Sequence, residues 1–280
     1  MRLLGAHMSI AGGVDQAIDR GASIDCTAIQ IFVKNNNRWY GKAISEEEAG
    51  RFKQKREETG IFVFAHTGYL INLASPKPDI YKKSMESMLD ELNRCELLEI
   101  PFIVLHPGSF LDSSAEIGTK KIADSLNKLF SRTEDSKVRV ALETTAGQGS
   151  SIGHTFEELQ QIIDLIKAKS RIGVCFDTCH TYAAGYDLKS EAGYKEVWKH
   201  FDGIIGLDQL LAFHLNDSKK EFQSRKDRHE QIGKGFLGLE SFRNLMNDKR
   251  FNKIPMVLET YKGPDLKEDI ENLKILRDLA

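Results

Sequence analysis

The chain has 280 residues, of which 41% are hydrophobic and 29% are charged, and its formal net charge is −2. These values are typical of a globular protein with a hydrophobic core, and they exclude a largely disordered or strongly basic chain. Any surface for a polyanion must therefore be a local patch. The four cysteines form no Cys-x-x-Cys pair, and no apolar run approaches the length of a membrane span. We therefore expect a cytoplasmic protein with reduced thiols and no membrane contact.

Eight short apolar runs predict strands that alternate with helices. In chain order they cover residues 3–7, 28–33, 61–65, 101–105, 138–142, 172–176, 211–213 and 255–258. Helices are expected from about residue 14, from 45, over 79–98 and 115–130, from 155 and from about 266. Ser45 with Glu48 and Thr155 with Glu158 match the capping box that marks a helix start. Strand–helix units of roughly 35 residues, joined by right-handed crossovers, close into a parallel barrel. The sequence thus predicts an α/β fold, one (β/α)8 barrel domain over residues 1–280.

Six of the expected strands end in a residue that can bind a metal ion: His66, His106, Glu143, Asp177, His214 and Glu259. Taken alone, Asp177 would more often be a helix N-cap, and a nearby histidine such as His180 a surface residue. A parallel barrel, however, brings all strand ends to one face, where the active sites of this fold lie. Three carboxylates at that face would repel one another without cations. The set therefore predicts a centre for divalent ions, with nitrogen and oxygen ligands suited to zinc or manganese.

Three further residues in loops add to this set. His180 follows Asp177 closely, and Asp227 and His229 lie beyond the seventh strand. Together they supply enough ligands for another open zinc site. Cys179 is also a candidate zinc thiolate, although the set is complete without it. Several metal ions close together suit hydrolysis at phosphorus.

The loops after strands two and seven combine positive charge with aromatic rings. The basic residues are Lys34, Arg38, Lys219, Lys220, Arg225 and Lys226. The aromatic residues are Trp39 in the same region, Tyr69 after strand three and Tyr182 after strand six. Such a surface suits nucleic acid. The same residues are equally explained as solvated loops and packing contacts, and the residues alone leave both interpretations open.

Three segments resemble the endonuclease IV family of apurinic/apyrimidinic endonucleases. They are His66-Thr67-Gly68-Tyr69-Leu70-Ile71-Asn72-Leu73-Ala74, Val174-Cys175-Phe176-Asp177-Thr178-Cys179-His180, and His214-Leu215-Asn216-Asp217-Ser218-Lys219 with Asp227-Arg228-His229. The resemblance extends from Gly5-Ala6-His7 to Leu258-Glu259-Thr260, essentially the whole chain. It implies a TIM barrel that holds three zinc ions.

The implied activity is hydrolysis of the phosphodiester 5′ to an abasic site, which leaves a 3′-hydroxyl and a 5′-deoxyribose phosphate, together with removal of blocking groups from 3′ ends in base excision repair. By resemblance, His66, His106 and Glu143 would hold the first zinc. Glu143 would bridge to a second zinc, also held by Asp177, His214 and Glu259, and His180, Asp227 and His229 would hold the third. The attacking hydroxide would lie near Glu143, the expected catalytic residue, which would also assist as a base.

The resemblance also implies double-stranded DNA as the partner, bound by a monomer that associates with the nucleoid when it works. Tyr69 and Leu70 match the positions that fill the gap left by the flipped-out abasic sugar, and Lys34, Asn37, Arg38 and Lys219 are the other expected DNA contacts. Two residues depart from the family pattern. Asn37 lies where better-known members carry an arginine, and Gln223 replaces a glycine usual after Lys219.

Two alternatives remain at this stage. A metal-dependent sugar isomerase uses the same barrel and similar strand-end ligands, but it has no need of the Asp227-x-His229 group. A non-catalytic protein that binds damaged DNA, with zinc as a scaffold, would not need an intact ligand set.

Overall fold

The computed structural model describes residues 2–280, and its centre is a closed barrel of eight parallel strands. The barrel strands are β1 (Leu4–Met8), β2 (Ala28–Phe32), β3 (Phe62–His66), β4 (Phe102–Leu105), β6 (Arg139–Glu143), β8 (Ile172–Asp177), β9 (Leu210–His214) and β12 (Met256–Leu258). They pair in the order β1-β12-β9-β8-β6-β4-β3-β2, so the first and last strands close the ring. The predicted fold is confirmed, and each observed strand overlaps its predicted run.

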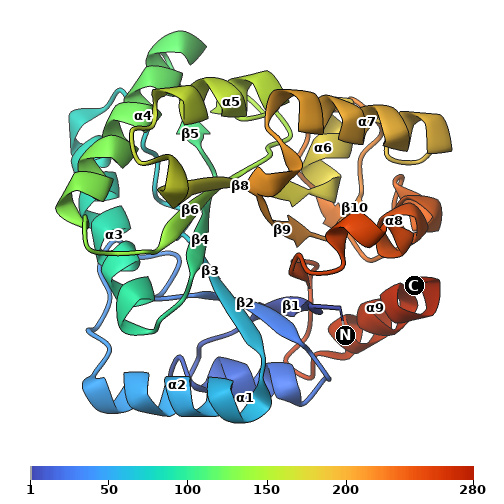
Figure 1. The fold of residues 1–280 in the computed structure, drawn as a ribbon, viewed down its shortest axis with the longest axis horizontal. Coiled ribbons are helices and arrows are strands. Elements are labelled where there is room, and N and C mark those ends of the chain that lie inside the picture. The colour runs from blue at the N-terminus through green and yellow to red at the C-terminus, as the bar shows by residue number, and fades with distance from the viewer. Residues whose placement is uncertain (1) are drawn as a thin grey trace.

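Helices surround the ring (Figure 1), and all but the last stand between successive barrel strands in the chain. They are α1 (Gln16–Ala22), α2 (Glu46–Thr59), α3 (Pro78–Leu97), α4 (Ala115–Arg132), α5 (Phe156–Leu165), α6 (Thr178–Ala184), α7 (Glu191–Ile204), α8 (Gly238–Asn247) and α9 (Lys267–Leu279). Each helix packs an apolar side against the strands, which in turn are covered on both faces. None of the helices within residues 2–280 is long and apolar enough to span a membrane.

Two short antiparallel pairs and α6 build up the loops beyond the strand ends. β5 (Gly108–Ser109) pairs with β7 (Ser151–Ile152), and β10 (Asp217–Ser218) pairs with β11 (His229–Glu230). Short 3-10 turns cover 169–171, 207–209 and 249–251. The β10–β11 pair is important for the site, because it folds the segment after β9 back over the barrel mouth.

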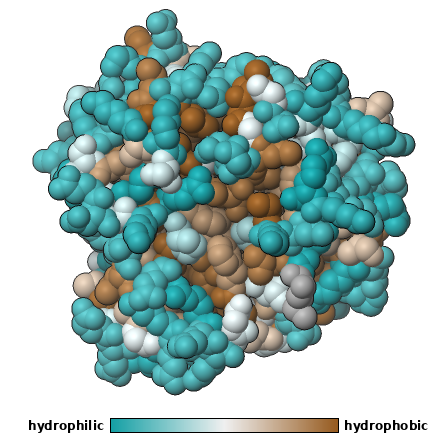
Figure 2. Space-filling view, in the orientation of Figure 1, coloured by the Kyte–Doolittle hydropathy of each residue, from teal (hydrophilic) through white to brown (hydrophobic). Residues whose placement is uncertain are grey.

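The core has two layers, one between strands and helices and one inside the barrel. The inner layer contains Phe64, Phe102, Val104, Ala141, Cys175, Ala212 and Val257. The opening that the ribbon leaves at the centre of Figure 1 is therefore filled by side chains. On the face drawn in Figure 2, apolar residues gather at that centre and hydrophilic residues surround them. A packed interior of this kind gives the strand ends a rigid base.

The predicted helix starts at Ser45 and Thr155 are confirmed at the N-cap. The Ser45 hydroxyl accepts a hydrogen bond from Glu48 N–H, and the Thr155 hydroxyl accepts one from Glu158 N–H. The reciprocal half of the capping box is absent among the described contacts of both helices. Instead, the Glu48 carboxylate accepts from Val14 N–H, and the Glu158 carboxylate accepts from Gly153 N–H. Each glutamate thus ties its helix to a neighbouring loop.

Candidate metal centre

The strand-end residues point into the barrel because of the two-residue period of a strand. Along β6, Val140 and Leu142 face the helices, whereas Ala141 faces the interior. Glu143 is two residues beyond Ala141 and therefore also faces inward, at the mouth. The same step relates Phe64 to His66, Val104 to His106, Cys175 to Asp177, Ala212 to His214 and Val257 to Glu259. The structure thus brings all six predicted strand-end residues to one place.

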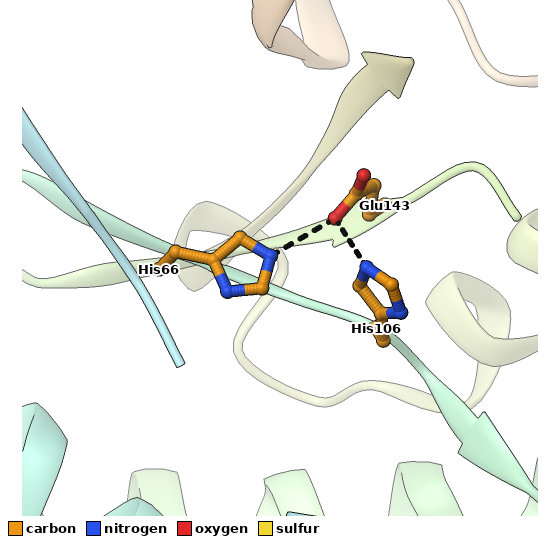
Figure 3. A group of neighbouring side chains, drawn as sticks. All are labelled: His66, His106 and Glu143. Carbon is orange, nitrogen blue, oxygen red and sulfur yellow. Dashed lines mark hydrogen bonds and ion pairs between the residues drawn. The ribbon is translucent and has the colours of Figure 1, made fainter. Parts of the chain in front are cut away.

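The first group consists of His66, His106 and Glu143 (Figure 3). One carboxylate oxygen of Glu143, Oε2, lies 3.1 Å from His66 Nε2 and 3.0 Å from His106 Nε2. The other ring nitrogen of His66, Nδ1, donates to the Thr67 carbonyl at 2.7 Å. Because a carbonyl only accepts, Nδ1 carries a proton, and Nε2 is the nitrogen that would bind a metal ion, as is typical of histidine ligands.

The second group uses the other oxygen of the same glutamate, together with Asp177, His214 and Glu259. His214 Nδ1 lies 2.9 Å from Glu143 Oε1 and 3.0 Å from Glu259 Oε2. Asp177 Oδ2 is 3.9 Å from the same nitrogen. Because its two oxygens face different groups, Glu143 joins the first group to the second.

The third group consists of His180, Asp227 and His229. Asp227 Oδ1 lies 3.1 Å from His180 Nε2 and 3.3 Å from His229 Nε2. His180 comes from α6, whose N-cap is Asp177: Oδ1 of Asp177 accepts from His180 N–H at 2.7 Å. Asp177 is therefore both an N-cap and a member of the cluster. His180 is buried, so the alternative of a surface histidine is wrong.

The nine residues combine four carboxylates with five histidines, and Lys and Arg residues within 2–280 form no ion pair with any of them. Although burial opposes ionisation, His106 and His214 hold the pKa of Glu143 well below its ordinary value. Burial likewise opposes protonation of His180, yet Asp177 and Asp227 raise its pKa well above the ordinary range. The cluster therefore requires positive charge, and divalent cations with nitrogen and oxygen ligands fit it.

Cys179 lies close to Asp177 and His229, within the distance of a possible ligand. Burial raises the pKa of its thiol to about 12, which disfavours the thiolate that a zinc ion binds. Its Sγ is 3.6 Å from the Arg228 carbonyl, to which it donates. These contacts favour a structural role for Cys179.

The predicted DNA contacts fall into exposed and buried residues. Tyr69 and Leu70 are 65% and 37% exposed, and Asn37, Arg38 and Lys219 are exposed as well. The Tyr69 ring packs edge-on against Phe32, with 5.3 Å between ring centroids, and lies 6.2 Å from the His66 ring. Tyr69 therefore lies directly beside the first group while most of its surface remains accessible.

Lys34 does not fit its predicted role as a phosphate contact. Its side chain is only 2% exposed, and Nζ lies 3.0 Å from Asp90 and 3.3 Å from Glu91 on α3. Glu91 in turn accepts the Gly68 N–H at 3.1 Å. The lysine is thus the cation of a buried ion pair that connects the loop after β2 to the loop after β3, and it cannot reach DNA.

We expect Lys34→Met to lower the free energy of unfolding by about 3–5 kcal/mol, because it leaves the buried Glu91 carboxylate without its partner. Chemical denaturation of the variant measures this loss. Lys42→Met changes an exposed lysine in the same loop and is the matched control, with an expected change near zero. Equal stability of the two variants would contradict the ion-pair assignment.

Tyr182, expected above as a possible stacking surface, is also unavailable. It is 5% exposed, and its hydroxyl donates to the Phe236 carbonyl at 3.3 Å. Gln223, which replaces a glycine of the family pattern, has φ 61°, a left-handed conformation that glycine adopts without strain.

Sequence reasoning missed Asn216, Gln30 and His7 at the barrel mouth. The Asn216 side chain donates to Asp177 Oδ2 at 2.7 Å, and its Oδ1 accepts from Glu259 N–H. Gln30 and His7 are the inward-facing polar residues of β2 and β1. The available signal was an amide inside the apolar run Ala28-Ile29-Gln30-Ile31-Phe32, which has to find buried hydrogen-bond partners.

Comparison with known proteins agrees with this geometry. Residues 18–278 match the family model described as xylose isomerase-like TIM barrel. A protein of Geobacter sulfurreducens named probable endonuclease 4 is 50% identical over 278 residues, which cover 99% of this chain and 94% of the relative.

Among solved structures, endonuclease IV from Thermus thermophilus superimposes with a TM-score of 0.88 at 33% identity and covers 100% of this chain and 98% of its own. A D-tagatose 3-epimerase-like protein superimposes with a TM-score of 0.76 at 19% identity, over 100% of this chain and 97% of that one, a likeness of fold alone. The strand-end residues, the full-length identity and the structural agreement lead to one conclusion: the chain belongs to the endonuclease IV family, within the xylose isomerase-like TIM barrels.

Proposed function

We propose that this protein is a zinc-dependent DNA repair endonuclease that hydrolyses the phosphodiester 5′ to abasic sites and cleans blocked 3′ ends in base excision repair. The observation that carries the proposal is the third group, His180, Asp227 and His229, which adjoins the two groups at the strand ends. A barrel that isomerises sugars needs only strand-end ligands. This third group favours a three-ion centre and phosphodiester hydrolysis, and the relatives of this chain are named as probable endonucleases.

When bound, divalent ions would polarise the phosphate and lower the pKa of a water molecule. The side chains of this protein would hold the ions and orient the attacking water. Glu143 stays ionised because its surroundings hold its pKa low, so its oxygens can act as ligands and accept a hydrogen bond from the attacking water. His66, with its Nδ1 proton on the Thr67 carbonyl, keeps Nε2 directed at Glu143. His106 and Asp227 are the most exposed members of the centre, with side chains 42% and 40% exposed, and mark the side from which a phosphate would approach.

DNA would lie across the barrel mouth, with Tyr69 and Leu70 in the gap left by the flipped-out sugar and Asn37, Arg38 and Lys219 near the backbone. We propose that the protein acts as a monomer in the cytoplasm, on the nucleoid. A duplex with one tetrahydrofuran abasic analogue tests the activity: we expect a single nick 5′ to the analogue and none in the undamaged duplex. Protein with a full zinc complement that leaves the analogue intact would refute the proposal.

The alternative is a metal-dependent sugar isomerase on the same barrel, in keeping with the family description xylose isomerase-like TIM barrel. Metal content separates the two. Three tightly held zinc ions per chain support the nuclease, whereas one or two exchangeable ions support the isomerase.

We expect Tyr69→Ala to lower kcat/KM on an internal abasic site about 10- to 100-fold, and much less on a frayed 3′ end. Loss of a stacking side chain costs about 1–3 kcal/mol, and a frayed end needs less unstacking. Steady-state kinetics on the two substrates measure the difference. Tyr69→Phe, which keeps the ring, is the control and should behave as wild type. If Tyr69→Ala slows both substrates equally, Tyr69 acts on the metal centre through His66.

We expect Lys219→Ala to weaken binding to any duplex and to reduce the slope of log K against log salt by about one phosphate contact. Titration of fluorescent duplexes at several salt concentrations gives the slope. Lys274→Ala, on the exposed side of α9, should leave it unchanged. An unchanged slope for Lys219→Ala would place the phosphate contacts on other residues.

A further inference from the structure

Gln30 is a fully buried amide inside the barrel, on a strand that contributes no member of the metal centre. Its neighbours Ile29 and Ile31 face the helices and belong to the outer core, so the side chain of Gln30 faces inward. A buried amide without partners costs free energy, and its hydrogen bonds therefore show what it is for.

Three hydrogen bonds fix the orientation of this amide. Nε2 of Gln30 lies 2.6 Å from Glu259 Oε1 and 2.9 Å from His7 Nδ1, and Oε1 lies 2.7 Å from His214 Nε2. An ionised carboxylate only accepts, so the NH2 group must face Glu259. The carbonyl oxygen must then face His214, which donates through Nε2–H.

This orientation determines which atoms His214 and Glu259 present to the metal centre. With Nε2–H donated to the Gln30 carbonyl, Nδ1 is the nitrogen that His214 presents to the centre, 2.9 Å from Glu143 Oε1, where its lone pair would be available to a bound metal ion. With Oε1 of Glu259 engaged by the amide, Oε2 remains, 3.0 Å from the same nitrogen. One amide thus orients two residues of the second group toward the same point.

His7 completes the arrangement from the neighbouring strand. Burial lowers the pKa of His7 to about 3, so the ring is neutral and its Nδ1 accepts the second N–H of the amide. The three partners together satisfy both amide protons and the carbonyl oxygen of Gln30, which leaves the amide a single low-energy orientation.

We propose that Gln30 is the positioning residue of the second metal site: it selects the Nδ1 lone pair of His214 and the Oε2 atom of Glu259 as ligands. The inference rests on the proposed metal-dependent function. Outer partners of metal ligands typically contribute about 10- to 100-fold to metal affinity. Loss of Gln30 should therefore weaken one ion of the centre more than the others.

Gln30→Met tests the proposal, because methionine has a similar volume and no strong donor or acceptor. The matched control is Asn272→Leu. Asn272 is also a buried amide; it hydrogen-bonds to Ile232 N–H, Gln231 and Thr260, and to none of the nine residues. We would measure zinc retained per chain against increasing chelator, and the visible spectrum of the cobalt(II)-substituted protein.

We expect Gln30→Met to release one ion at a chelator concentration about 10- to 100-fold lower than wild type, with a changed cobalt spectrum. Asn272→Leu should match wild type in both measurements. This holds even if the metal-free forms of Gln30→Met and Asn272→Leu both have lower melting temperatures than wild type. Gln30→Asn retains the amide but is too short to reach both partners, so it should release the same ion. It replaces Gln30→Met in the test if that variant does not fold.

Wild-type chelator resistance and an unchanged cobalt spectrum in both Gln30 variants would overturn the proposal. An equal loss in Asn272→Leu would also overturn it, because general destabilisation would then explain the effect. Failure of the proposed function gives a different result, in which wild-type protein itself binds no zinc or leaves the abasic duplex intact.

Discussion

Glu143→Gln is expected to lower kcat/KM on an abasic duplex by about a thousandfold or more. Glu143 is the one residue that takes part in both strand-end groups, through Oε2 toward His66 and His106 and through Oε1 toward His214. The amide removes the negative charge and turns one of these oxygens into a donor. A loss of about 4 kcal/mol of transition-state stabilisation corresponds to that factor.

His180→Asn is the comparison, because His180 belongs chiefly to the third group and its loss should reduce activity less. Steady-state kinetics and elemental analysis of both variants, purified without chelator, decide the point. Glu143→Gln should also lose zinc, from a wild-type value near three ions per chain. Equal, small losses in the two variants would show that Glu143 is not at the chemical centre.

The positions of the strand-end residues can be predicted from the sequence because two simple rules of strand geometry apply together. Inward and outward residues alternate along a strand, and parallel strands in a barrel end at one face. His66 and His214 are far apart in the chain, yet their ring centroids lie 5.9 Å apart. Only the apolar runs and the type of residue that follows each were needed to predict this convergence.

Local patterns failed where a distant part of the fold supplied a better partner. In the sequence, nothing distinguishes Lys34 from an exposed loop lysine. Its ion pair with Glu91 becomes visible only when α3 is placed beside the loop. The carboxylate of Glu48 reaches Val14 N–H instead of the N-cap, because α1 packs against α2. Such contacts depend on the tertiary arrangement and leave no periodic signal in the sequence.

Very short elements were missed for a related reason. The two-residue strands β10 and β11 are too short to show an alternating pattern, although they position His229 over the barrel mouth. Gln30 was missed because one polar residue in an apolar strand is weak evidence alone. Its importance comes from the three partners that other strands bring to it.

Removal of the metal ions is expected to destabilise the protein as well as to abolish cleavage. Without cations, no Lys or Arg within residues 2–280 pairs with the buried carboxylates of Glu143 and Asp177, and burial raises the pKa of Asp177. A ligand present at 1,000 times its dissociation constant stabilises the folded state by about 4 kcal/mol. In a chain of this size each kcal/mol corresponds to roughly 2–4 °C, so we expect the melting temperature to fall by about 10 °C or more.

Calorimetry of chelator-stripped and zinc-reconstituted protein measures this shift, with cleavage of the abasic duplex followed in parallel. Stability and activity should return together as zinc is added, and the titration should end near three equivalents per chain. The third group has two partly exposed members, since Asp227 and His229 have side chains 40% and 20% exposed, whereas the first group has only His106, at 42%, and the second is almost wholly buried. Its ion should therefore contribute least to the melting temperature and leave first under mild chelation. A metal-free protein with unchanged melting temperature would mean that the cluster tolerates its buried charges without cations, and the three-ion centre would then lose its physical basis.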